Sequence, residues 1–211
     1  MHETFTIAAV FMIGFFHAFE MDHLAAVSTI VTKRKTLLSA IKDGIFWGLG
    51  HTSTIFLVGM ALIFFKLSFD AQLFSDFEGI VGLMLIGIGG FRMYQLFYKN
   101  GHEHGHDVDD EHHHSHSHKL AYGVGLIHGL AGSGSIVLLV ISKVHNSWNS
   151  MLFLMIFGVG SILGMLVAAG IFSLPFSKKI TKNQYLRKGL VVLSSLICIS
   201  IGGILFYENL L

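Results

Sequence analysis

Six stretches of this 211-residue chain are apolar over roughly the 20 residues that a helix needs to cross a bilayer. Their approximate bounds are 4–32, 43–65, 77–98, 119–142, 148–176 and 188–208. Composition agrees, because 53% of the residues are hydrophobic and 13% are charged, about half the charged fraction of a soluble domain. No strand-like alternation of useful length is present. The sequence therefore predicts an all-α integral membrane protein with six transmembrane helices and no soluble domain.

Basic residues between these stretches predict how the chain lies in the membrane. Twelve of the 14 Lys and Arg residues fall in or beside the first, third and fifth connections, whereas Lys66 and Lys143 fall in the other two. Because basic loops stay on the cytoplasmic side, we expect the odd-numbered connections in the cytoplasm. Both termini would then lie outside the cell (inner) membrane. No basic helix or aromatic platform suggests a nucleic-acid partner. The expected partner of the helices is the lipid bilayer.

The two halves of the sequence resemble each other. The segment 14–18 (Gly-Phe-Phe-His-Ala) matches 125–129 (Gly-Leu-Ile-His-Gly), and two further glycine motifs match at similar offsets in the same order. A repeat of three helices must invert in the membrane, an architecture that transporters use. We expect a 3+3 inverted repeat, with a first repeat in 1–98, a histidine-rich cytoplasmic loop in 99–118 and a second repeat in 119–211.

The first apolar stretch contains four ionisable residues within seven positions, namely His17, Glu20, Asp22 and His23. A charge in hydrocarbon loses its hydration, so such residues usually face a protein interior or a water-filled path and mark function. Imidazole nitrogens and carboxylate oxygens together bind divalent transition metals. The alternative is a polar network that only holds helices together. We expect metal handling, because helix contacts rarely need two imidazoles and two acids in so short a segment.

Three histidines fall at one depth. His23, His51 and His128 each lie nine residues from the expected cytoplasmic end of their own stretch. That distance is about 13 Å along a helix, close to the middle of a hydrocarbon core about 30 Å thick. The expected metal site therefore lies between helices at the membrane midplane and adds His51 and His128 to the first group.

The position of Asp22 leaves two geometries open. On a continuous helix, His17, Glu20 and His23 share a face about 120° wide, and Asp22 lies off that face. Either Asp22 orients a histidine from behind, or the helix unwinds here and turns Asp22 inward.

Two further groups of residues are candidates for weaker metal contacts. The first is a low-complexity block in 101–118, where eight histidines alternate with acids: His102, His104, His106, His112, His113, His114, His116 and His118. This composition predicts a disordered cytoplasmic segment that buffers metal, with a solvated linker as the alternative. The second is Met1 with His2, whose amine, amide and imidazole nitrogens suit extracellular capture of Ni²⁺ or Cu²⁺, with a frayed terminus as the alternative.

Several of these motifs resemble those of one protein family. His17-x4-Asp22-His23, within the segment 17–27, is similar to the signature of the nickel/cobalt transporter family, and especially to its urease-accessory-type nickel permease branch. The segments 50–52 (Gly-His-Thr) and 128–133 (His-Gly-Leu-Ala-Gly-Ser) resemble further motifs of that branch. In the larger eight-helix permeases of the family, the first motif binds the metal. This chain departs from them in its six expected helices and in 131–134 (Ala-Gly-Ser-Gly), which replaces their acidic fourth-helix motif.

The resemblance implies a secondary transporter and no enzyme: a permease for Ni²⁺, with Co²⁺ as a second cargo, moving metal into the cytoplasm. No bound cofactor is expected, and cytoplasmic nickel chaperones or urease maturation proteins are the implied partners. Nickel or cobalt efflux on the same scaffold is the first alternative. A membrane-embedded metalloenzyme and a metal-independent exporter are the others; the first should have more histidine boxes, and the second needs no His17/His23 pair.

Overall fold

The computed structural model of the chain describes residues 2–34, 36–65, 71–98, 114–131, 147–176 and 183–210; side chains are described within these ranges except at 2–6, 71, 114–117 and 131. Every regular element in these ranges is helical. In chain order they are α1 (His2–His17), α2 (Met21–Val31), α3 (Leu37–Phe64), α4 (Ala71–Tyr98), α5 (His114–Ala131), α7 (Ser147–Ser173), the 3-10 helix η2 (Leu174–Phe176) and α8 (Gln184–Leu210).

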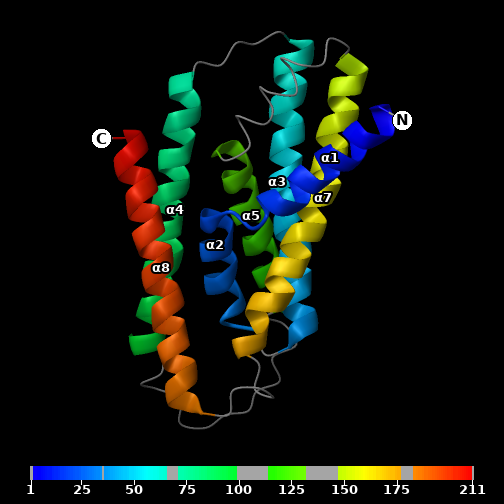
Figure 1. Cartoon of the computed structure of the whole chain (residues 1–211). Coiled ribbons are helices and arrows are strands. Elements are labelled where there is room, and N and C mark those ends of the chain that lie inside the picture. The colour runs from blue at the N-terminus through cyan, green and yellow to red at the C-terminus, as the bar shows by residue number, and fades with distance from the viewer. Residues whose placement is uncertain are drawn as a thin grey trace.

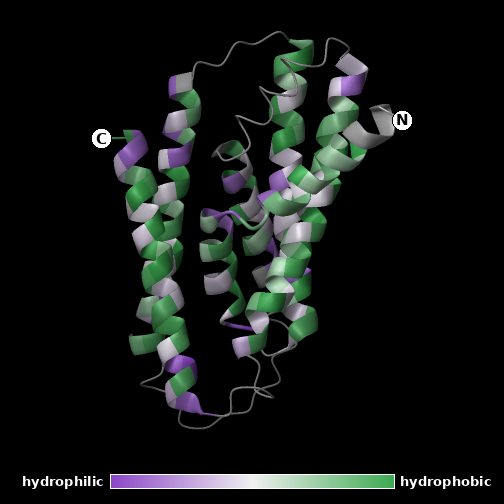
Figure 2. Cartoon of the chain, in the orientation of Figure 1, coloured by the Kyte–Doolittle hydropathy of each residue, from purple (hydrophilic) through white to green (hydrophobic). Residues whose placement is uncertain are grey.

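The described helices have the length and hydropathy of membrane spans. Four of them are long and apolar enough, at Leu37–Phe64, Gln72–Tyr98, Ser147–Phe176 and Gln184–Leu210. A fifth is present if the bent pair Ile7–His17 and Met21–Val31 counts as one span. Hydrophilic residues concentrate at the helix ends and near the centre of the bundle (Figure 2). The described part of the chain is therefore all-helical and has the spans of a multi-pass membrane protein. The predicted span 119–142 is described only as far as Ala131, so its second half lies outside the described residues.

The first predicted span, 4–32, differs from a single continuous helix and takes the interrupted geometry that the sequence left open. Helix α1 ends at His17, α2 begins at Met21, and the two axes differ by 54°. A second difference concerns the expected loop 99–118, because α5 already begins at His114. The reason for this early start is visible at His118, whose ring contacts buried Asp43 of α3. That contact holds the first turns of α5 against the bundle.

The helices form two packed groups with the shorter α2 and α5 between them (Figure 1). On one side α4 packs along α8; on the other α3 packs along α7 and α5, and α1 crosses α7. The pair α4–α8 closes at Gly82 and Gly202, where a Cβ on either residue would lie 2.6 Å from the carbonyl oxygen of the other. Both marked chain ends lie at the same end of the bundle, opposite the α2–α3 connection (Figure 1).

Two glycines bring helices of the other group into backbone contact. A Cβ at Gly14 of α1 would collide with the carbonyl oxygen of Phe157 in α7, and a Cβ at Gly125 of α5 would collide with that of Trp47 in α3. Small residues permit such approach, and close van der Waals packing supplies much of the attraction between helices in lipid. These two contacts hold α1 and α5 close to the helices on which the candidate site is built.

A buried ion-pair network joins three segments at the α2–α3 end. Asp43 is 2% exposed and accepts hydrogen bonds from both sides of its carboxylate. The Arg34 guanidinium donates to it through Nε and, at 2.6 Å, through Nη2. His118 Nδ1 lies 2.8 Å from Asp43 Oδ1. This network ties the connection after α2 and the start of α5 to α3.

Candidate metal centre

The break between α1 and α2 is the local feature that builds the centre. Residues 18–20 form a turn in which the Phe19 amide donates to the Phe16 carbonyl at 2.8 Å, and Glu20 is extended (φ −64°, ψ 154°) before α2 begins. Neither Gly nor Pro lies between residues 15 and 24. Instead, Asp22 in the first turn of α2 accepts the His23 backbone N–H at 2.8 Å. A carboxylate at this position satisfies a free amide and suits the positive end of the helix dipole, so it favours a helix start here.

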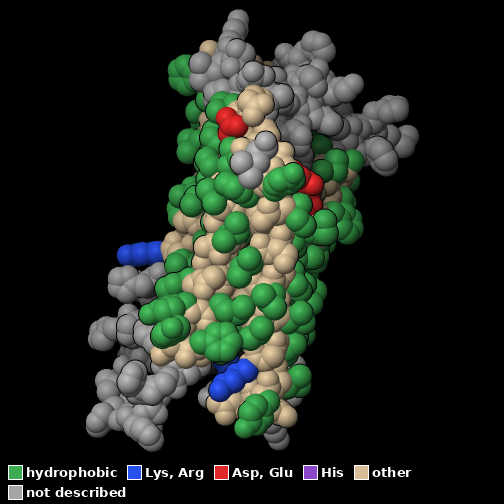
Figure 3. Space-filling view, turned by 90° about the vertical axis from the view of Figure 1, so that its left-hand side faces the viewer, with side chains coloured by type: hydrophobic (Ala, Val, Ile, Leu, Met, Phe, Trp, Pro, Cys, Tyr) green, Lys and Arg blue, Asp and Glu red, His purple; other side chains and the backbone are tan. Residues whose placement is uncertain are grey.

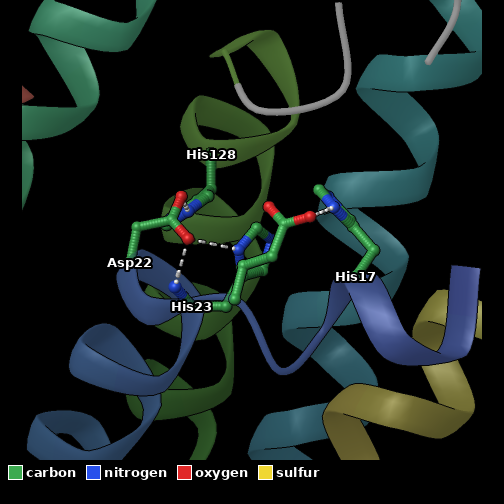
Figure 4. A network of polar contacts seen from close by, with 5 residues as sticks. His17, Asp22, His23 and His128 are labelled. Atoms are coloured by element: carbon green, nitrogen blue, oxygen red, sulfur yellow. Dashed lines mark hydrogen bonds and ion pairs between the residues drawn. The ribbon is translucent and has the colours of Figure 1, made fainter. Parts of the chain in front are cut away.

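The break turns Asp22 inward, where it contacts two imidazoles. Its Oδ1 lies 3.0 Å from His23 Nδ1, and its Oδ2 lies 2.8 Å from His128 Nε2 of α5 (Figure 4). The structure thus combines the two geometries that the sequence left open, because the helix is interrupted and the carboxylate also orients histidines. A carboxylate only accepts hydrogen bonds, so each of these ring nitrogens must carry the proton.

Four imidazoles from three regions of the chain meet at this point. The ring centroid of His23 lies 4.6 Å from that of His17, 5.1 Å from that of His51 in α3 and 4.1 Å from that of His128. All four side chains are buried, with residue exposures of 3% or less. The structure therefore brings His23, His51 and His128 into one cluster.

In three of the histidines, one ring nitrogen is hydrogen-bonded to a carboxylate and the other ring nitrogen makes no hydrogen bond within the described residues. His17 Nδ1 lies 2.8 Å from Glu20 Oε1, while His23 and His128 share Asp22. Among the described residues, His17 Nε2, His23 Nε2 and His128 Nδ1 are buried and make no hydrogen bond. Since the carboxylate side carries the ring proton, a neutral ring has its lone pair at the free nitrogen. This carboxylate–imidazole arrangement is the one that commonly orients histidines toward a metal.

Ligand atoms of these residues lie close enough together to share an ion. One ligand atom from each of His17, His23 and His51 falls within 4.8 Å of the other two, and the same holds for Asp22, His23 and His128. Both nitrogens of His51 are buried without a partner among the described residues. An unpaired buried polar atom costs free energy, and five such nitrogens in one cluster are accounted for if a ligand binds there. Nitrogen donors with a carboxylate suit Ni²⁺, Co²⁺, Zn²⁺ or Cu²⁺.

Aromatic side chains close the centre on two sides. The Trp47 ring stacks on His23 with centroids 5.7 Å apart and an interplanar angle of 25°, and the Phe157 ring lies 5.4 Å from that of His17. Both aromatic residues are almost fully buried. They line the cluster with apolar surface, which strengthens the electrostatic interactions inside it. Sequence reasoning missed both, although Trp47 stands four residues before His51 and therefore on the same helix face.

All six residues predicted for the site lie in this one cluster: His17, Glu20, Asp22, His23, His51 and His128. Glu20 is at its edge, with a side chain 51% exposed. That the cluster holds a metal stays a prediction.

The peripheral candidates are placed only in part. Met1, His102, His104, His106, His112 and His113 lie outside the described residues. His2 begins α1, and His114 and His116 lie in α5, but their side chains are not described. His118 is partly buried against Asp43 and belongs to the helix packing there. Metal capture at 1–2 and metal buffering at 102–118 stay predictions.

Two known proteins are similar to most of the chain. The urease accessory protein UreH of Bacillus sp. (strain TB-90) is 36% identical over 172 residues, which cover 79% of this chain and 75% of that protein. A protein of Methanocaldococcus jannaschii named as a candidate nickel/cobalt efflux system is 29% identical over 200 residues, which cover 91% of this chain and 87% of that one. No profile of a protein family matches the chain. No solved structure matches it either.

Proposed function

Because this chain belongs to the nickel/cobalt transporter family, in its UreH-type branch, we propose that it is a permease that carries Ni²⁺, with Co²⁺ as a second cargo, through the cluster around His23. As a member of this family it is a transporter and not an enzyme. The observation that carries the proposal is the set of buried imidazoles whose ligand atoms lie within 4.8 Å of one another and which keep free nitrogens.

In the proposed site, His17, His23 and His51 replace part of the hydration shell of the ion. Their nitrogens suit a divalent metal of borderline softness better than Mg²⁺ or Ca²⁺, which prefer oxygen ligands. Asp22 holds the lone pairs of His23 and His128 toward the ion and offsets its charge. Glu20, half-exposed beside His17, supplies a second negative charge at the rim. A cation entering this apolar enclosure is thus met by charge as well as by ligands.

The proposed architecture is two inverted halves of three spans, with the site near the membrane midplane at their seam. The first half holds α1–α2, α3 and α4, and the second holds α5, α7 and α8. Equivalent contacts support this division: the His17 ring lies 5.4 Å from that of Phe157, and the His128 ring lies 5.7 Å from that of Trp47. The two histidines are 111 positions apart and the two aromatic residues 110. Gly14 and Gly125, described above, pack in the same exchanged way.

Alternating access follows from such halves. Three imidazoles of the cluster come from the first half and one, His128, from the second, joined through Asp22. Rocking one half against the other would change the distances between these ligands and so release the ion on one side. We propose the cell (inner) membrane as the location, with the basic connections and the loop around 99–113 in the cytoplasm and both termini outside.

The names of the two relatives do not agree on the direction of transport. We propose uptake into the cytoplasm, in line with the more similar relative, which is named a urease accessory protein. Nickel chaperones and urease maturation proteins are the partners that we propose with it. Efflux is the second candidate, because the other relative is named as an efflux system. Radioactive nickel accumulation in cells with and without the protein separates them, since a rise means uptake and a fall means export.

The role of the cluster is tested by His23→Ala with Met21→Ala as its matched control. Met21 lies two residues away on the same helix and is 76% exposed, so its truncation leaves the cluster intact. We expect His23→Ala to abolish the change in nickel accumulation at an equal amount of protein in the membrane, and Met21→Ala to keep it. Full nickel transport by His23→Ala would refute the assignment.

A further inference from the structure

A cavity of about 450 Å³ opens between the last turns of α4 and the first turns of α8, away from the histidine cluster. Its polar lining consists of three cations and two amides: Arg92, Arg187, Lys188, Gln95 and Gln184. Leu96 and Val191 complete it. The volume falls within the range of small-molecule sites.

The charge in this cavity is unbalanced. Within the described ranges, no carboxylate lines it, and Arg187 and Lys188 have no ion pair. Arg92 is held in place by neutral groups, because its Nε donates to Thr32 Oγ1 at 2.6 Å and its Nη2 donates to the Thr32 carbonyl at 3.3 Å. Three like charges around one hollow repel each other, and an anion bound between them relieves that repulsion. Arginine forks and amide N–H groups suit the oxygens of a phosphate.

The surroundings of the cavity indicate where that phosphate comes from. Arg92 lies six residues before the end of α4 and Arg187 three after the start of α8, so the cavity is within about 9 Å of both helix ends. Exposed tyrosines stand at this level, with Tyr94 57%, Tyr98 72% and Tyr185 85% exposed. Tyrosines at that level are typical of the membrane–water interface.

The outer surface of α4 and α8 fits an acyl-chain environment. The face in Figure 3 is largely hydrophobic, with Lys and Arg in its lower half and Asp and Glu in its upper half. A soluble phosphate ester would find polar groups in the cavity, but the exposed apolar side chains on the same helix turns, such as Phe91, Phe97 and Leu186, would stay without a partner. A phospholipid satisfies both, because its headgroup enters the cavity while its chains lie along the helices.

We propose that this cavity binds the phosphate of an anionic phospholipid headgroup. Basic pockets between transmembrane helices take such headgroups. The site joins three helices, since Arg92 of α4 also binds Thr32 at the end of α2, the helix that carries His23. A bound headgroup therefore clamps α4 to α8 beside the end of α2. The proposal does not depend on which ion the chain transports.

The test compares lipid retention by the full-length protein purified in detergent, measured by native mass spectrometry. The probes are dioleoyl phosphatidylglycerol, tetraoleoyl cardiolipin and dioleoyl phosphatidylcholine. We expect the two anionic lipids to be retained over phosphatidylcholine and Arg187→Gln/Lys188→Gln to lose that preference. Each cation near an anionic headgroup is worth about fivefold in affinity, so the double change should cost about 25-fold. The matched control is Lys42→Gln/Lys119→Gln, which removes two exposed cations outside the cavity and should change retention little.

Two further arms decide the source of the phosphate and guard against a misfolded variant. Inorganic phosphate at millimolar concentration should not displace the anionic lipid; equal competition would overturn the headgroup assignment in favour of a free phosphate. In the unmodified protein, raising the salt concentration should release phosphatidylglycerol and leave phosphatidylcholine unchanged. A salt-independent preference, or equal loss of lipid in both double variants, would overturn the proposal.

Discussion

Replacing Asp22 by Asn keeps the shape of the side chain but changes one atom that faces a histidine. At present Oδ1 accepts from the His23 backbone and ring, and Oδ2 accepts from His128 Nε2. The amide can keep the two contacts to His23 through its one oxygen, which leaves its NH₂ group facing His128. His128 must then present the Nε2 lone pair to this amide and move its proton to Nδ1. The nitrogen that was free to bind an ion becomes a donor.

The expected cost falls on metal affinity more than on stability. Removing a carboxylate that orients a metal-binding histidine costs about 10- to 100-fold in affinity, which is about 1.4 to 2.8 kcal/mol. The hydrogen bond between α2 and α5 survives in altered form, and such bonds between helices in membranes contribute about 0.6 kcal/mol on average. Asp22→Asn should therefore melt near the temperature of the unmodified protein and yet bind nickel at least tenfold more weakly.

The assay is equilibrium binding of radioactive nickel to purified protein, with Glu20→Gln as the matched control for the loss of one negative charge. Glu20 contacts a single ring nitrogen and is 51% exposed, so Gln can keep its oxygen on His17 and turn its NH₂ toward the outside. The control should lose much less affinity than Asp22→Asn. Equal Kd values for Asp22→Asn and the unmodified protein, or equal losses in the two variants, would refute the lone-pair argument.

Three other perturbations test the site and the packing. Acid should release nickel, because neutral imidazole is the ligand and protons compete with the ion for its lone pair; nickel binding measured over a series of falling pH values should decrease, and flat binding would contradict the ligand set. Gly125→Ala should lower the free energy of unfolding by about 1 to 3 kcal/mol, because the new Cβ collides with the Trp47 carbonyl. Gly123→Ala is the control, because there is open space around Gly123. Thermal melting in detergent compares the two variants, and equal melting temperatures would refute this account. Asp43→Asn should destabilise the protein by about 3 to 5 kcal/mol, because it removes the charge of the buried carboxylate that Arg34 and His118 both contact; an unchanged melting temperature would count against a structural role for the network.

The histidines and acids of the cluster were predictable because their chemistry conflicts with their surroundings. An imidazole or carboxylate in an apolar run stands out in the sequence, and equal spacing from the expected helix ends predicts one depth for His23, His51 and His128. The aromatic walls could not be found in this way, since Trp47 and Phe157 are ordinary members of apolar helices. Their position beside the histidines depends on how α3 and α7 pack.

The sequence could not decide whether the first span is continuous or interrupted, for a different reason. No Gly or Pro between residues 15 and 24 signals a helix break. The partner that fixes the inward position of Asp22 is His128, which is 106 positions away. A contact of that separation carries no local signal. The early start of α5 is similar, because it depends on the contact of His118 with Asp43, 75 positions earlier.

The interruption at residues 18–20 has a mechanical consequence. His17 ends one rigid segment and His23 belongs to the next, so their 4.6 Å centroid separation depends on the angle between α1 and α2. Changing that angle requires rotation only at three linking residues and leaves both helical hydrogen-bond ladders intact. An ion bound to both rings would fix the angle, and opening the angle would move the two rings apart. Ion binding at these two rings would therefore be coupled to the angle between α1 and α2.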